Sequence, residues 1–235
     1  MKRIALAALM ILFFAASIAD ADTFTLAASV DDTRGVQRIT GGSTQDNDPT
    51  LTYLVFGRWD VLESHYAYWT YVRFALDIPK GSTIDSSFIR FTCFDGAYQH
   101  TFNTTIEGGT TSGSPAWKHV VNGLGLTSYA DNDALLAIAR FGSVAWSPAG
   151  VATNATYDTP SLNSLLQTMV DSPDYDPTSA TDKYVLFIVD DGSGNYDDDD
   201  MRSVHSWDGD PSKDAQLIVT YTPPSGGAQI IIIRR

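Results

Sequence analysis

The chain has 235 residues and a formal net charge of −13, and only two of its 28 acidic residues, Glu63 and Glu107, are glutamate. A surface this acidic is repelled by nucleic-acid phosphates and by anionic membranes, so no nucleic acid is expected as a partner. Aspartate favours turns and caps over helix interiors, and together with 18 Gly and 10 Pro it indicates a chain rich in strands and loops. The length suits one domain, which we place at residues 22–222.

Residues 1–21 have the parts of a secretory signal peptide. Two basic residues precede an apolar run over residues 4–16, and Ala19 and Ala21 form a small-residue cleavage site. We therefore expect cleavage after Ala21 and a secreted, extracellular protein. The apolar run is too short for a comfortable membrane span and no second candidate follows it, so no membrane span is expected.

Short segments rich in β-branched and aromatic residues follow one another along the chain, and each is bounded by Gly, Pro, Asp or Ser. Alternation of apolar and polar residues within some of them indicates strands that bury one face. The eight segments predicted as strands are residues 23–30, 51–57, 67–76, 86–94, 134–146, 183–190, 202–207 and 215–221. This series predicts an all-β, jelly-roll-like antiparallel β-sandwich.

One segment, about 160–171, has a helical pattern instead. Its apolar residues recur with helical spacing at Leu162, Leu165, Leu166, Met169 and Val170. Thr159 and Pro160 are expected to begin the helix as its N-cap and first-turn residues, and Pro173 is expected to stop it. We predict a single short helix that covers one end of the sandwich.

Three segments have the pattern of a known family. Residues 71–91, YVRFALDIPKGSTIDSSFIRF, contain a strand, an Ile-Pro-Lys-Gly turn and a second strand introduced by Thr-Ile. Residues 28–33, ASVDDT, look like a first strand and turn, and residues 202–222 look like a closing strand pair. The pattern resembles that of the DNRLRE or disaggregatase-related family of carbohydrate-binding modules.

That resemblance implies a secreted β-jelly-roll, usually an accessory or adhesive domain of larger extracellular proteins with polysaccharide or cell-surface ligands. The chain departs from the family pattern in residues 38–70 and 95–158, which do not match. We also expect no catalytic module for the domain to serve.

The acidic loop DDGSGNYDDDD, residues 190–200, is placed by the resemblance in the penultimate hairpin. Its candidate metal ligands, at alternating positions, are Asp191, Ser193, Asn195, Asp197 and Asp199. It is no EF-hand, because Tyr196 and Arg202 stand where that loop has glycine and a bidentate glutamate. Three interpretations stay open, namely a bound Ca²⁺, weak surface binding of cations, and a solvated loop. Asp31 and Asp32 are a second, separate candidate for Ca²⁺.

No catalytic motif stands out. The chain has no Gly-x-Ser-x-Gly elbow, no His-Glu-x-x-His pair and no Walker loop. Its aspartates are too abundant for one glycosidase carboxyl pair to be singled out, and none of its four histidines has a recognisable spacing to a nucleophile. We therefore expect no catalytic residues and no enzyme, and a polysaccharide-degrading enzyme ranks third among the functions considered.

Aromatic side chains beside polar ones are the candidate sugar site, because flat rings stack on pyranose faces while polar neighbours bond the hydroxyls. The ligand-binding candidates are Trp59, Tyr66, Tyr68, His205 and Trp207. Alternation along their strand sends Tyr66 and Tyr68 to one face. It sends Trp69 and Tyr71 to the other, so one pair is expected in the core and the other at the surface. His205 is expected to be exposed on the same argument.

Residues 223–235 combine a Pro/Gly linker with an Ile-rich tail. The segment 228–233 is expected either to pack on its own domain as a final strand or to self-associate by pairing with a sheet edge of another copy.

Two functions therefore lead. The first is a secreted, non-catalytic carbohydrate-binding or adhesive module for an extracellular polysaccharide or a cell-surface glycan, with Ca²⁺ as its candidate cofactor. The second is a structural subunit of an extracellular or surface assembly that uses the Ile-rich tail.

Overall fold

The computed structural model describes residues 20–26, 31–38, 44–45, 51–61, 64–97, 101–110, 135–192 and 200–224. The strands are β1 (Asp20–Thr25), β2 (Asp32–Arg38), β3 (Thr44–Gln45), β4 (Tyr53–Val61), β5 (Ser64–Ala75), β6 (Thr83–Asp95), β7 (Thr104–Thr110), β8 (Ala139–Trp146), β9 (Thr156–Asp158), β10 (Tyr184–Val189), β11 (Met201–His205) and β12 (Gln216–Thr222). The helix is α2 (Asn163–Val170). The pairings between these strands are antiparallel, which confirms the predicted all-β class.

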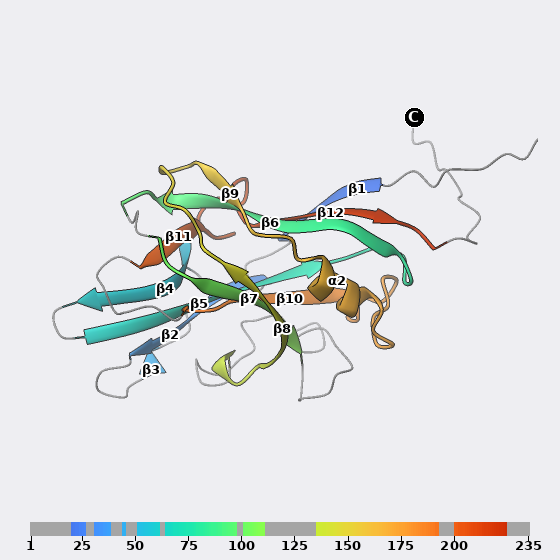
Figure 1. The fold of residues 1–235 in the computed structure, drawn as a ribbon, viewed down its shortest axis with the longest axis horizontal. Coiled ribbons are helices and arrows are strands. Elements are labelled where there is room, and N and C mark those ends of the chain that lie inside the picture. The colour runs from blue at the N-terminus through green and yellow to red at the C-terminus, as the bar shows by residue number, and fades with distance from the viewer. Residues whose placement is uncertain are drawn as a thin grey trace, which may run out of the picture.

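The sheet curls into two facing layers, as a sandwich-like fold requires. Its strands follow the order β1-β12-β6-β11-β4-β5-β10-β7-β8, with β2 and β3 attached beside β5 and β9 attached beside β6. In Figure 1, β1, β12 and β6 run across the upper layer, and β4, β5 and β10 run across the lower one.

Strand β4 changes its pairing partner at Gly57. Its first half, residues 53–57, pairs with β11, whereas residues 57–61 pair with β5. Gly57 has a φ of +108°, and a Cβ at this position would collide with the backbone carbonyl of Asp200. Both conditions require glycine at the residue where β4 changes its pairing partner.

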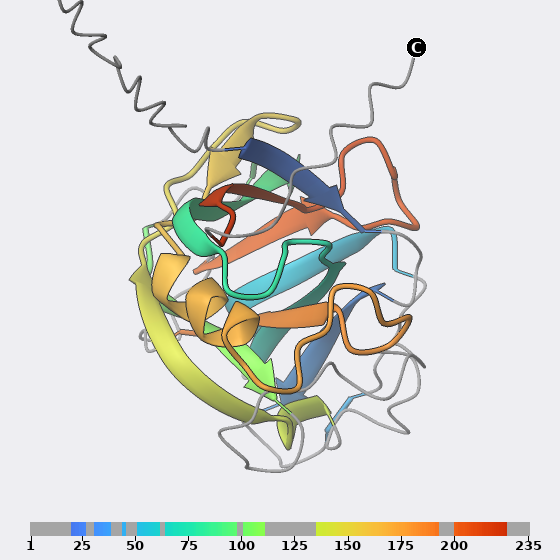
Figure 2. The ribbon, with the colours of Figure 1, turned by 90° about the vertical axis from the view of Figure 1, so that its right-hand side faces the viewer.

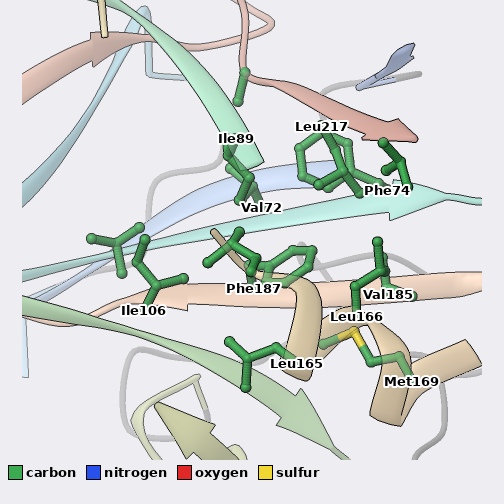
Figure 3. Close-up of a cluster of buried hydrophobic side chains, with 14 of the residues drawn as sticks. Val72, Phe74, Ile89, Ile106, Leu165, Leu166, Met169, Val185, Phe187 and Leu217 are labelled. Carbon is green, nitrogen blue, oxygen red and sulfur yellow. The ribbon is translucent and has the colours of Figure 1, made fainter. Parts of the chain in front are cut away.

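The main core lies between the layers and draws on nearly every long strand. Val72 and Phe74 of β5, Phe187 of β10, Ile89 of β6 and Leu217 of β12 meet there, as Figure 3 shows. Strand β10 is apolar throughout because its other face is covered as well.

Helix α2 closes one end of this core, as predicted, and Figure 2 brings it to the front of the molecule. Leu165, Leu166 and Met169 point from it into the core (Figure 3). The predicted helix start was wrong, because the N-cap residue is Leu162 and no side chain caps it. Thr159 Oγ1 instead accepts a hydrogen bond of 2.9 Å from the backbone N–H of Ile89, so it serves β6 and not the helix.

Segment 134–146 is a strand over only part of its predicted length. Strand β8 begins at Ala139, and Leu135 and Ile138 before it pack on the outer face of β5 and β10. Strands β2, β3, β7 and β9 were not predicted, since they are short and polar or, in β7, contain two glycines.

Among the described residues, no helix has the length and apolar character needed to cross a membrane. Most of the predicted signal peptide and residues 225–235 of the predicted tail lie outside the described ranges, so both predictions stay as they are. Strand β1 includes Asp20 and Ala21, and cleavage after Ala21 would shorten it by two residues.

Candidate functional site

A groove opens on the sheet where β2, β4, β5, β6 and β11 come together. It encloses about 190 Å³ and is lined by Arg34, Tyr53, Val55, Trp59, Tyr68, Phe94, Asp95, Met201 and Ser203. We call this site, together with the adjoining ring of Tyr66, the aromatic groove. Its lining residues span positions 34 to 203, so only the folded sheet assembles it.

Aromatic rings form most of the groove wall. Tyr53 stacks on Phe94 with ring centroids 4.8 Å apart. Tyr66 lies 6.3 Å, between ring centroids, from both Trp59 and Tyr68. Tyr68 is buried, whereas the other four rings are half-buried and present part of their surface to solvent. The groove therefore offers flat apolar area to a ligand.

Polar groups stand beside these rings. The Arg34 guanidinium lies over the rings of Tyr53 and Tyr68, 5.5 and 5.6 Å from their centroids. Asp95 is exposed, and its backbone N–H donates to Ser203 Oγ at 3.2 Å. The groove thus combines a cation, a carboxylate and a hydroxyl with its aromatic wall.

The structure brings together three of the five predicted ligand-binding residues, Trp59, Tyr66 and Tyr68. The alternation argument is confirmed, because Trp69 and Tyr71 lie in a different cluster on the opposite face. Tyr53 and Phe94 were not predicted, although the same alternation applied to residues 53–56 and 88–94 would have found them. Arg34 was missed because β2 was not recognised as a strand.

His205 is buried and not exposed as predicted, with 8% of its surface accessible. The edge of its ring meets Phe94, with centroids 5.2 Å apart, and its Nε2 lies 3.3 Å from Asn154 Oδ1. Burial, with the charge of Lys213, lowers its pKa. The prediction failed because residues from other parts of the chain cover this end of β11.

Trp207 does not line the groove. Its half-buried ring packs against the main core, and its backbone N–H donates to Asp32 Oδ2 at 2.8 Å. Trp207 therefore makes a structural contact and is not part of the groove.

Asp31 and Asp32, predicted together as metal ligands, have different surroundings. Asp31 forms an ion pair with Arg73, whose Nε lies 2.9 Å from Asp31 Oδ1, and both side chains are almost fully buried. Asp32 is also buried, and burial is the main cause that raises its pKa to about 7. The charges of three other aspartates, Asp208, Asp214 and Asp31, add to that rise.

A second, larger hollow of about 460 Å³ lies at the start of the acidic loop. It is lined by Arg58, Asn103, Thr104, Thr105, Ala145, Asp190, Asp191 and Gly192. Asp191 Oδ2 accepts a hydrogen bond of 2.8 Å from Arg58 Nε. Burial and the neighbouring Asp190 nevertheless raise the pKa of Asp191 to about 7, because they outweigh the attraction of the guanidinium.

The other candidate ligands of this loop, Ser193, Asn195, Asp197 and Asp199, lie outside the described residues. In the part of the chain that is described, no three His, Cys, Asp or Glu side chains group together as metal ligands. Calcium binding by the loop therefore stays a prediction.

No protein-family model matches the chain, and no curated protein matches it. The resemblance to the DNRLRE family stays an expectation based on three sequence segments.

Proposed function

We propose that the protein is a secreted, non-catalytic carbohydrate-binding module that holds its ligand in the aromatic groove. One observation carries this proposal. Four half-buried aromatic rings and one buried ring line a groove that also presents Arg34 and Asp95.

The groove suits the chemistry of a pyranose ring. Such a ring has C–H groups that pack on aromatic faces and hydroxyl groups that need hydrogen-bond partners. The rings of Tyr53, Trp59 and Phe94 supply the apolar surface. Arg34 donates hydrogen bonds and Asp95 accepts them.

Charge and size indicate the ligand class. A chain of net charge −13 repels polyanionic glycans, so a neutral polysaccharide or cell-surface glycan is favoured. The volume of about 190 Å³ lies below the roughly 300–1,000 Å³ of sites that enclose a whole small molecule. The groove therefore accommodates one or two sugar units of a longer chain.

The number of carboxylates in the groove favours binding over cleavage. Glycosidases typically place two carboxyl groups across the scissile bond. Asp95 is the single acid among the described residues that line the groove. A groove with one acid and five aromatic rings is better suited to retaining a sugar than to hydrolysing it.

The proposal is tested by native gel electrophoresis of the chain through gels that contain neutral polysaccharides such as glucan, xylan or mannan. At least one polysaccharide should retard the wild-type chain. Trp59→Ala should weaken this binding roughly 5–30-fold, since a stacked ring contributes about 1–2 kcal/mol. The matched control is Phe88→Ala, because Phe88 is a half-buried ring on β6 that does not line the groove.

Retardation of the control variant should equal that of the wild type. If none of the polysaccharides retards the wild type, or if Trp59→Ala migrates as the wild type does, the groove is not the sugar site.

A further inference from the structure

Three carboxylate oxygens are buried without a hydrogen-bond partner in the described part of the chain. They are Asp32 Oδ1 and both carboxylate oxygens of Asp214. The two residues are 1% and 2% exposed. Buried carboxylates are normally hydrogen-bonded or paired with a cation, because an uncompensated buried charge is strongly unfavourable. These oxygens therefore lack the partner that a buried carboxylate normally has.

The two aspartates are distant in sequence, and the fold brings the segments that carry them into contact. Asp32 begins β2, and Asp214 lies two residues before β12 in the loop between β11 and β12. The hydrogen bond of 2.8 Å from the Trp207 N–H to Asp32 Oδ2 fixes that loop against the start of β2. The negative charges of Asp208 and Asp214, both carried by that loop, add to the rise in the pKa of Asp32.

The loop that carries Asp214 is held in place by its own contacts. The backbone N–H of Asp210 donates to the carbonyl of Ser206, and that of Lys213 donates to the carbonyl of Asp210. The Ser206 hydroxyl donates to the carbonyl of Leu51. Asp214 is therefore presented by an ordered loop and not by a free end.

The basic side chains beside these aspartates are engaged with other acids. Arg73 pairs with Asp31, and Lys213 Nζ lies 3.1 Å from Asp210 Oδ2. Neither is available in this arrangement to neutralise Asp32 and Asp214 together.

We propose that Asp32 and Asp214 bind one divalent cation, Ca²⁺, which ties the start of β2 to the loop between β11 and β12. The site differs from the acidic loop at residues 190–200, and it does not depend on the sugar-binding function. Asp31 is not a ligand in this proposal, because Arg73 already holds it.

The ligand set indicates moderate affinity. Ca²⁺ takes six to eight oxygen ligands, and two carboxylates supply only part of that number. The remainder has to come from backbone carbonyls and water, because no three His, Cys, Asp or Glu side chains group together as metal ligands among the described residues. We expect a Kd of about 10⁻⁴–10⁻³ M, as in other extracellular modules.

The test is a thermal melt of the full chain at pH 8, first in chelator and then in rising concentrations of Ca²⁺. The melting temperature should rise by about 3–10 °C at roughly 10–100 times Kd. Asp32→Asn and Asp214→Asn should each abolish the rise. Asp171→Asn, which removes an exposed charge after α2, should keep it.

A further control separates the two acidic regions. Changing the four aspartates at positions 197–200 to asparagine should leave the rise intact. In chelator, Asp214→Asn should melt no lower than the wild type, because the substitution removes a buried, unpaired charge.

A spectroscopic readout covers the case in which an aspartate variant does not fold. Tb³⁺ in place of Ca²⁺ should give luminescence sensitised by Trp207, whose backbone contacts Asp32. Trp207→Phe should lose most of that emission and keep the Ca²⁺-dependent rise. The proposal is overturned if the wild type shows no rise, if the two Asn variants keep it, or if the 197–200 variant loses it.

Discussion

Strand β5 carries two pairs of aromatic side chains that face opposite ways and have different fates. Trp69 and Tyr71 lie on the outer face, where Leu135 and Ile138 cover them. Tyr66 and Tyr68 lie on the other face, in the aromatic groove, where no such segment is seen among the described residues. Because the two pairs are alike in composition, what distinguishes a core from a candidate binding surface here is the covering segment and not the aromatic content.

The covered face should therefore contribute to stability and the groove to binding.

Trp69→Ala has the largest expected effect. The ring is 8% exposed, and its indole N–H donates to Asp190 Oδ1. We expect a loss of about 3–5 kcal/mol in the free energy of unfolding, measured by denaturant titration. Trp59→Ala, from the half-buried groove wall, should lose about 1 kcal/mol or less. Equal losses of stability for the two variants would contradict the assignment of stability to the covered face and of binding to the groove.

Leu135→Ala tests the cover itself. Leu135 is fully buried against the outer face of β5 and β10. Its truncation should cost about 2–4 kcal/mol of stability, because it leaves a cavity over Trp69. Polysaccharide retardation of the folded variant should be unchanged, and a loss of retardation would mean that the two faces are coupled.

Asp191 gives the covered side a pH dependence. Burial raises its pKa to about 7, while the unfolded chain deprotonates near 4, so the folded state holds this proton more tightly. The stability that this proton contributes is present below pH 4 and is lost as the pH rises to about 7. Relative to Asp191→Asn, the wild type should therefore lose on the order of 1–2 kcal/mol over this range.

Melting temperatures of both proteins in chelator from pH 4 to pH 8 measure this difference. Parallel curves would show that Asp191 does not titrate as its surroundings indicate.

Arg34→Ala has the smallest expected effect on stability and tests the groove. Its guanidinium lies over two groove rings, a contact that contributes about 0.5–1 kcal/mol at an exposed site. The free energy of unfolding should change by that amount at most, whereas affinity for the polysaccharide should fall several-fold. Unchanged affinity would remove Arg34 from the site.

Local patterns in the sequence predicted the strand class, the helix and the facing of Tyr66 and Tyr68. The patterns did not predict burial where segments that are distant in the sequence meet. The exposure of His205 was wrong because Phe94 and Asn154 cover it, and the cover over Trp69 comes from residues more than sixty positions away. Asp214 carries no local signal at all, since only its burial in the folded chain, in a loop that contacts Asp32, makes its carboxylate unusual.

The most direct test of the groove is ¹⁹F NMR of the chain labelled with 5-fluorotryptophan. The five tryptophans give separate reporters, each assigned by a single Trp→Phe variant. On addition of a soluble oligosaccharide of a retarding polysaccharide, the Trp59 resonance should shift, while those of Trp69 and Trp146 stay in place. Binding that leaves Trp59 unmoved and shifts another tryptophan would contradict the account and place the ligand elsewhere.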